Sequence, residues 1–170
     1  MVASEARDGT PLPDDLRWGT YVTFDGETEY VKECFSQYGV LTDASGRYAA
    51  LWRPYHLIGL ELGISVASVG LRGEATGSAE EFRGDVVATA KFDMRAGEEL
   101  DGEGGYTVWG KLMPSADSLA IGGLPIGLAH GMTLKRDIAA GELLSWDDVI
   151  FDANDPAIQF RREMEQAFSG

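Results

Sequence analysis

The spacing of apolar residues predicts a strand and then a helix near the start of the chain. Every second residue after Leu16 is aromatic or β-branched: Trp18, Thr20, Val22 and Phe24. This period of two predicts a strand, which the turn-forming pair Asp25-Gly26 ends. From Glu27 to Tyr38 the apolar residues change to helical spacing, which predicts a helix with Cys34 as a small core residue.

A second strand and a second helix are predicted after the turn over residues 42–46. The apolar run from Tyr48 to Arg53 indicates a strand. Pro54 disfavours the α region at Arg53 and has a φ suited to a first helical position, so we predict a helix from Pro54 to about Arg72. The result is a β-α-β-α portion, an α/β part of a larger domain, over residues 16–76.

Small and polar residues follow separate faces of this second helix. Gly59, Gly63, Ala67 and Gly70 share one face, which we call the small-residue row. Glu61, Ser65, Ser68 and Arg72 share another, the polar row. The apolar stretch is shorter than the roughly 18 residues that a membrane span requires. We therefore predict a buried core helix that another backbone crowds on the small-residue row.

The second half of the chain differs in pattern and contains an internal repeat. Beyond the connector at 74–84, short apolar runs alternate with glycines, which places a domain boundary there. The segment 90–100 recurs as 134–144, each with an aspartate opening a turn that closes at a glycine, Gly97 or Gly141. A glycine there permits positive φ. The predicted domain covers residues 85–150, and Asp155 and Pro156 then cap a C-terminal helix over residues 155–168.

Composition narrows the possible partners. The chain has 28 acidic and 14 basic residues and a net charge of −14, which repels phosphate backbones and anionic lipid headgroups. We therefore expect neither nucleic acid nor membrane partners. Residues 1–15 are small, polar and charged without an apolar period, so we expect a flexible arm that lacks the features of a signal peptide. Cys34 is the single cysteine, and a cytoplasmic location is the expectation.

The candidate chemistry lies where the second strand meets the second helix. Arg53, Tyr55, His56 and Glu61 are the polar or ionisable side chains in an otherwise apolar run. Arg53 and Tyr55 are predicted to bind an anionic substrate group, while His56 and Glu61 are candidates for proton transfer. The alternative is a structural role for Glu61, as part of a surface stripe or as a paired buried carboxylate.

Other loops offer no site for a nucleotide or a metal. The segments 101–110 and 122–131 are rich in glycine but lack a dinucleotide fingerprint and the Lys-Ser/Thr pair of a P-loop. His130 precedes Gly131, and with two histidines in the whole chain we interpret it as a turn residue rather than a metal ligand. No cofactor-binding or metal-binding residues are predicted.

These motifs resemble two known families. The doubled Lys-x-Asp-x-x-Ala-Gly-Glu-x-Leu unit, followed by residues 146–149, is similar to the SAF domain of sialic acid synthases, type III antifreeze proteins and flagellar chaperones. Residues 48–73, 101–110 and 124–129 resemble the C-terminal half of predicted homoserine dehydrogenases that carry a SAF domain, a family that includes deoxyxylulose-phosphate reductoisomerase-like enzymes. The resemblance implies an α+β chain in which the β-α-β-α portion precedes a mostly β, β-clip SAF domain.

The resemblance also implies an activity that this chain completes rather than performs alone. Such enzymes use NAD or NADP bound to a Rossmann domain, and no Gly-x-Gly-x-x-Gly unit occurs in these residues. The leading hypothesis is therefore the substrate-side portion or subunit of an NAD(P)-dependent oxidoreductase. It would act on a small polar or phosphorylated substrate with a separate Rossmann domain or subunit, as a homo-oligomer, and be inactive as this chain alone.

Two hypotheses of other classes remain. One is a non-catalytic SAF module that binds a sugar acid or joins subunits, which requires only residues 85–150. The other is a secreted pilus or flagellar chaperone, which shares the SAF resemblance but requires an export signal that these residues do not display.

Overall fold

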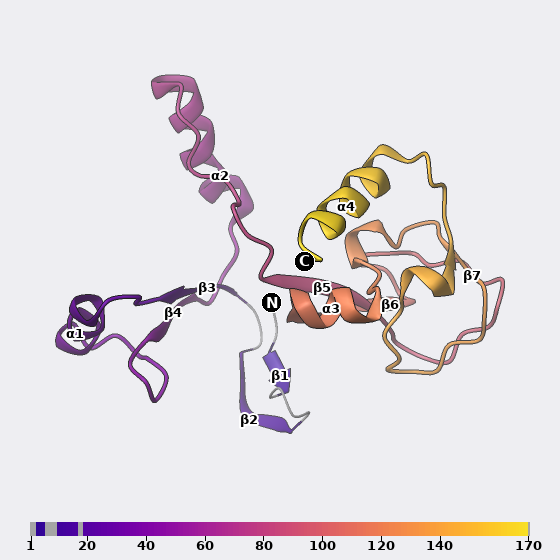
Figure 1. Cartoon of the computed structure of the whole chain (residues 1–170), viewed down its shortest axis with the longest axis horizontal. Coiled ribbons are helices and arrows are strands. Elements are labelled where there is room, and N and C mark those ends of the chain that lie inside the picture. The colour runs from indigo at the N-terminus through magenta and orange to yellow at the C-terminus, as the bar shows by residue number, and fades with distance from the viewer. Residues whose placement is uncertain (1–2, 6–9, 17–18, 170) are drawn as a thin grey trace. The chain divides into compact units, whose positions relative to one another are not determined.

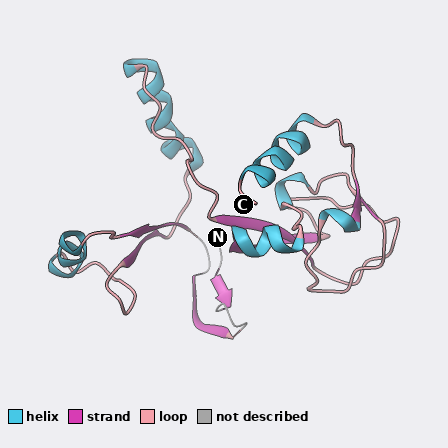
Figure 2. Cartoon of the chain, viewed as in Figure 1, coloured by secondary structure: helices cyan, strands magenta, loops and turns pink. Residues whose placement is uncertain are grey.

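The computed structural model describes residues 3–5, 10–16 and 19–169. The chain divides into two compact units, residues 1–78 (unit 1) and 79–170 (unit 2), with the division inside the connector 74–84. Helices and strands both contribute, and each sheet has two antiparallel strands (Figures 1 and 2). The α+β class predicted from the sequence is therefore confirmed.

Unit 1 begins with a pair of strands that the sequence did not predict. β1 (Ala3–Glu5) pairs with β2 (Pro11–Leu16) in antiparallel orientation. The flexible arm expected over residues 1–15 falls partly on residues outside the described ranges, namely 1–2 and 6–9. In the described residues the backbone pairs as two strands although the sequence there has no apolar period, because backbone pairing does not require one.

A β-hairpin enclosing a helix follows. β3 (Thr20–Asp25) pairs with β4 (Tyr48–Arg53) in continuous register. Between them, α1 (Glu29–Gln37) starts at Thr28, whose side chain accepts a hydrogen bond from the Val31 N–H. Phe24 of β3 meets Phe35 of α1 edge to face, with 5.5 Å between ring centroids. The predicted order and the bounds of β4 are confirmed, although α1 is shorter than the predicted helix at 27–38.

The second helix begins later than predicted. α2 (Ile58–Ala67) continues into a π-helical turn, η1 (Ser68–Arg72), so the predicted end near Arg72 is confirmed. The start at Pro54 was wrong because Leu57 has ψ 74°, outside the helical range. Pro54 instead begins a short link between β4 and α2.

The second helix is exposed, which contradicts the prediction of a buried core helix. No residue of α2 is buried, and Leu60 and Ile64 are 76% and 71% exposed. A Cβ built on Gly59, Gly63 or Gly70 would meet no atom within 4 Å. An apolar helix ordinarily packs against another element, but no element in the described part of unit 1 packs over this one.

Unit 2 folds around a hydrophobic core. β5 (Gly84–Ala90) pairs with β6 (Val108–Pro114), and β7 (Thr133–Leu134) pairs with β8 (Val149–Ile150). The connections carry α3 (Ser115–Ile121) and two 3₁₀ turns, η2 (Ile126–Leu128) and η3 (Trp146–Asp148). The fully buried large side chains come from segments throughout this unit: Met94, Leu100, Leu124, Leu134, Ile138 and Leu144, among others.

The two copies of the repeat interlock through matched hydrogen bonds. Met94 and Ile138, equivalent positions of the two copies, each donate a backbone N–H to the other's carbonyl, at 2.8 and 2.9 Å. Gly97 N–H donates to the Leu134 carbonyl, and its counterpart Gly141 N–H donates to the Ala90 carbonyl, both at 2.8 Å. Each copy therefore completes the backbone pairing of the other, in an approximately two-fold arrangement.

The turn glycines have the conformation that the repeat predicted. Gly97 and Gly141 have φ of 89° and 80°, the left-handed region in which a side chain is disfavoured. Asp137 accepts a hydrogen bond from the Ala96 N–H of the other copy at 2.9 Å, and Asp93 accepts one from Ala140 N–H at 2.8 Å. The repeated aspartate thus fastens the turn of the opposite copy.

The last helix, α4 (Pro156–Ala167), is tied to the core of unit 2 by ion pairs. Asp155 caps its N-terminus as predicted. Arg161 lies between two carboxylates, with Nη2 2.5 Å from Asp85 Oδ2 and Nε 2.8 Å from Glu165 Oε1. All three side chains are largely buried. The mostly polar sequence of this helix thus includes a buried ion-pair network that fixes where the helix docks.

Candidate functional site

The junction between β4 and α2 brings together the side chains predicted to carry the chemistry. Arg53 is the last residue of β4 and Glu61 lies in the first turn of α2. Their side chains form an ion pair, with 2.5 Å between Arg53 Nη1 and Glu61 Oε1. Residues 54–57 form a non-helical link that begins at Pro54. This link brings the first turn of α2 back beside Arg53.

His56 and Tyr55 complete the cluster. His56 Nδ1 lies 3.4 Å from Glu61 Oε2, so Glu61 uses one carboxylate oxygen for Arg53 and the other for the imidazole. The Arg53 guanidinium lies over the Tyr55 ring, 5.4 Å from its centroid. The structure therefore brings all four predicted residues into one group, which we call the Arg53 cluster.

The interactions in the Arg53 cluster favour the charged forms of both Arg53 and Glu61. The hydrogen bond from Arg53 lowers the pKa of Glu61, while partial burial opposes that shift and His56 adds to it. The same hydrogen bond raises the pKa of Arg53. Glu61 is thus a paired, partly exposed carboxylate, an arrangement that a structural ion pair and a proton-transfer site share.

The cluster stays open to solvent. The side chains of Arg53 and His56 are 55% and 61% exposed, whereas that of Glu61 is 29% exposed. Within the described ranges, the Arg53 guanidinium makes no hydrogen bond other than the one to Glu61. Its remaining N–H donors match the geometry of a carboxylate or phosphate, which accepts two parallel hydrogen bonds.

Gly19 supports the cluster and was not singled out from the sequence. It has φ 140°, and a Cβ at this position would collide with the Arg53 carbonyl and the Trp52 ring nitrogen. Thr20 next to it donates its hydroxyl to the Tyr55 carbonyl at 3.5 Å. The signal available in the sequence was a glycine inside the predicted strand, which often marks a close backbone approach.

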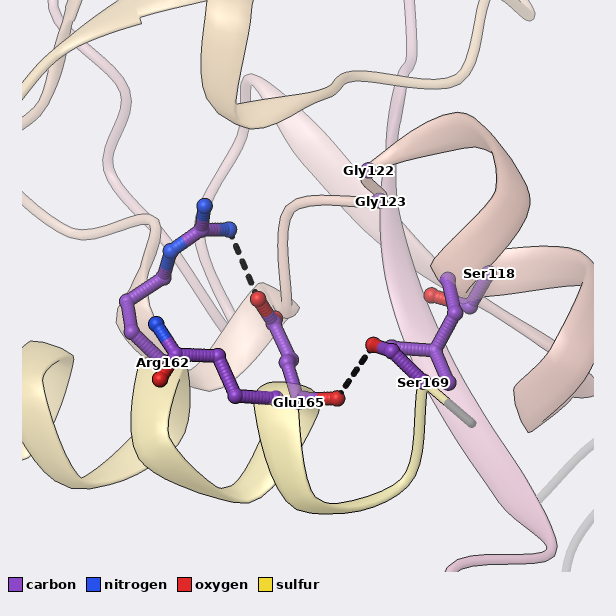
Figure 3. Close-up of a pocket in the computed structure, with 8 residues that line it drawn as sticks. Ser118, Gly122, Gly123, Arg162, Glu165 and Ser169 are labelled. Carbon is purple, nitrogen blue, oxygen red and sulfur yellow. Dashed lines mark hydrogen bonds and ion pairs between the residues drawn. The ribbon is translucent and has the colours of Figure 1, made fainter.

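Unit 2 contains a small cavity of about 200 Å³ that sequence patterns did not indicate. It lies between the end of α3 and the last turns of α4 (Figure 3). Several of its polar groups pair with one another: Arg162 Nη1 pairs with Glu165 Oε2 at 2.6 Å, and Ser169 donates to the Glu165 carbonyl at 2.5 Å. The Trp146 ring nitrogen also donates to Glu165. The Glu165 carboxylate at the cavity is thus shared among Arg161, Arg162 and Trp146 and is not left open for a ligand.

The glycine-rich loop at 101–107 is a closed structural turn. The Asp101 carboxylate accepts hydrogen bonds from the backbone of Tyr106 and from both the backbone and the hydroxyl of Thr107. These bonds lower the pKa of Asp101 to about 2. Lys91 closes the loop from outside, with Nζ donating to the Gly105 carbonyl at 2.6 Å. These polar groups therefore hydrogen-bond within the loop, as in a structural turn.

The described part of the chain offers neither a metal site nor a membrane-spanning helix. In the ranges 3–5, 10–16 and 19–169, no three His, Cys, Asp or Glu side chains group together as metal ligands would. Within the same ranges, no helix combines the length and the apolar character that crossing a membrane requires.

Comparison with known families assigns each unit a different relative. Residues 4–62 match the family model for the catalytic domain of oxidoreductase DRL, and this range contains the whole Arg53 cluster. Residues 85–150 match the SAF domain, which coincides with the repeat and the core of unit 2. No curated protein matches the chain. The two matches support an oxidoreductase-like protein with a SAF domain, whereas the homoserine dehydrogenase resemblance is not carried by either match.

Proposed function

We propose that unit 1 supplies substrate-binding and proton-transfer groups to an NAD(P)-dependent oxidoreductase that acts on a small polar or phosphorylated substrate. The observation that carries the proposal is the Arg53 cluster, because it lies inside the segment that matches an oxidoreductase catalytic domain. Unit 2 accompanies it as a SAF domain of the β-clip type. The Rossmann domain that holds the nicotinamide comes from a further domain or subunit.

The roles of the four residues follow from their partners. Arg53 binds the anionic group of the substrate through the guanidinium donors that Glu61 leaves free, and Tyr55 supports it by stacking. Glu61, held ionised by Arg53, orients the imidazole of His56 through Nδ1. His56 Nε2 is then directed at the reacting carbonyl or hydroxyl, where it moves the proton that accompanies hydride transfer.

The bound nicotinamide supplies the hydride, and this chain supplies positioning and the proton. Arg53 holds the substrate close to His56 in a defined orientation. Such positioning can accelerate the reaction by several orders of magnitude relative to a random encounter. Since Glu61 links both residues, a single carboxylate couples substrate binding to the orientation of the proton-transfer group.

The test is hydride transfer by the complete assembly, made by combining this chain with the protein that carries its Rossmann domain. Reduced nicotinamide is followed by absorbance against hydroxy acids, amino acids and sugar phosphates. Arg53→Gln is expected to raise KM at least tenfold, and His56→Gln to lower kcat with little change in KM. Arg47→Gln, in an ion pair with Asp25 on the same hairpin, is the matched control and should change neither.

Two results would contradict the proposal. Full activity in both the Arg53→Gln and the His56→Gln assemblies would remove the cluster from the reaction. Binding of a sugar acid by this chain without any hydride transfer in the assembly would favour the non-catalytic SAF module instead.

A further inference from the structure

The last helix of the chain contacts the first residues of unit 2. We call residues 82–85, which lead into and begin β5, the entry segment. The Arg161 guanidinium of α4 lies over the Phe82 ring, 5.0 Å from its centroid. Phe168, directly after α4, meets the same ring edge to face, with 6.0 Å between centroids. Two side chains from the end of the sequence therefore hold the start of this unit, and Figure 1 shows the end of α4 near the start of β5.

The backbone around Phe82 is held as well. Ser115, the first residue of α3, donates its N–H to the Arg83 carbonyl at 3.0 Å and its hydroxyl to the Phe82 carbonyl. Asp85 accepts hydrogen bonds from both terminal nitrogens of Arg161, at 3.2 and 2.5 Å. The entry segment is thus attached to two helices, through its backbone to α3 and through its side chains to α4.

The contacts of α4 are directed at the entry segment more than at the hydrophobic core. The buried residues of α4 are Ile158 and Glu165, and of these Ile158 belongs to the core. A helix that serves mainly to cover a core buries an apolar stripe along its length. Arg161 and Phe168 are instead seven residues apart, about two helical turns, so one side of the helix presents a cation and an aromatic ring to Phe82.

We propose that α4 and Phe168 form a clasp that anchors the connector 74–84 at Phe82. The C-terminal helix thereby sets how many residues of the connector move. This inference does not depend on the proposed function, because it uses contacts within unit 2 and no residue of the Arg53 cluster.

The clasp controls the effective length of the connector. The distance that a flexible linker spans grows with the number of its residues that move. While the clasp is closed, movement of the connector stops at Phe82. When the clasp opens, the movable stretch extends into the entry segment as far as the paired part of β5. Opening therefore increases the reach of whatever the connector joins to unit 2, without unfolding the core.

The first test is limited digestion of the full chain with trypsin. The bond after Arg83 lies in the entry segment, so its cleavage follows the fraction of molecules in which that segment is open. Phe168→Ala removes one contact to Phe82 and leaves the ion pairs of Arg161 in place. Cleavage after Arg83 should rise by roughly threefold or more. Phe160→Ala is the matched control, since Phe160 lies on the same helix but is 73% exposed, and it should leave the rate unchanged.

Cleavage at two other sites separates opening of the clasp from unfolding of unit 2. Arg95 and Arg136 lie in the two copies of the repeat, so cutting after them reports loss of the core fold. Neither Phe168→Ala nor Phe160→Ala should accelerate it. Phe82→Ala, which removes the clasped ring itself, should behave as Phe168→Ala does.

The second test follows the motion of the connector directly. In a Cys34→Ser background, a nitroxide attached to Glu80→Cys reports how freely the chain moves beside the entry segment. Its spectrum should be sharper when combined with Phe168→Ala than with Phe160→Ala. Unchanged cleavage after Arg83 in Phe168→Ala, an equal rise after Arg83, Arg95 and Arg136, or a nitroxide spectrum that Phe168→Ala leaves unchanged would each overturn the proposal.

Discussion

The two units have similar lengths but use their apolar residues in opposite ways. Unit 2 buries a continuous core that includes Met94, Leu100 and Ile138, each at most 2% exposed. In the described part of unit 1, Ala49 is the one apolar side chain that reaches full burial, at 4% exposed. Hydrophobic content alone therefore does not produce a core, because the chain must also bring two apolar surfaces together.

The first and largest expected effect is a difference in independent folding. A polypeptide of residues 79–170 should melt cooperatively, since it contains the core and both repeat copies. One of residues 1–78 should show no cooperative transition, because too little apolar surface is buried to offset the conformational entropy of folding. Circular dichroism melting of both pieces provides the measurement. A sharp transition in the first 78 residues would remove the contrast between the units.

The next effect concerns the ion pairs that hold α4. Arg161→Met leaves the buried carboxylates of Asp85 and Glu165 without their shared cation, and should reduce the free energy of unfolding by about 3–5 kcal/mol. Arg95→Met breaks the exposed pair with Asp137 and should cost far less, because solvent screens an exposed pair. Chemical denaturation compares the two. Equal losses would show that burial does not set the strength of these pairs.

A smaller loss is expected at the repeat turns. Gly97→Val or Gly141→Val forces a β-branched residue to a φ near 80–90°, at a cost of about 1–3 kcal/mol. Gly127→Val serves as the control because its φ is ordinary and its surroundings are open. Melting temperatures distinguish them. If all three variants melt together, the turns do not require positive φ.

The smallest expected effect depends on pH. The pKa of Asp101 in the folded chain is about 2, below its ordinary value of 3.8, so its ionised form stabilises unit 2. That contribution is complete above pH 3.8 and is lost as the pH falls toward 2. The melting temperature of wild type should therefore exceed that of Asp101→Asn at neutral pH and approach it near pH 2. A constant difference across this range would argue against the loop hydrogen bonds.

Local patterns predicted the parts of the fold that depend on local chemistry. The bounds of β4 follow from the run before Pro54, and the positive φ of Gly97 and Gly141 follows from the repeated turn sequence. The Arg53 cluster was also predictable in outline, since Arg53 and Glu61 are close along the chain and lie on either side of the strand–helix junction.

Features that depend on distant contacts were not predictable. The prediction that α2 is buried was wrong. An apolar pattern indicates that a helix tends to pack against another surface, but it does not indicate which surface that is. The ion pair that joins α4 to β5 was not predicted because Arg161 and Asp85 lie 76 residues apart, and neither residue marks its partner. The role of Gly19 became visible only when the Arg53 carbonyl was found beside it.

The interlocked repeat has a consequence for how unit 2 folds. Met94 and Ile138 are 44 residues apart, and the hydrogen bonds between the copies join segments at similar separations. Neither copy can complete its backbone pairing before the other has been synthesised, so contact order is high and loop closure must precede most of the stabilising contacts. During translation the first copy emerges with its backbone groups unpaired and the side chains of Met94 and Leu100 exposed. Unit 2 should therefore be slow to fold and most prone to aggregate while the second copy is still on the ribosome.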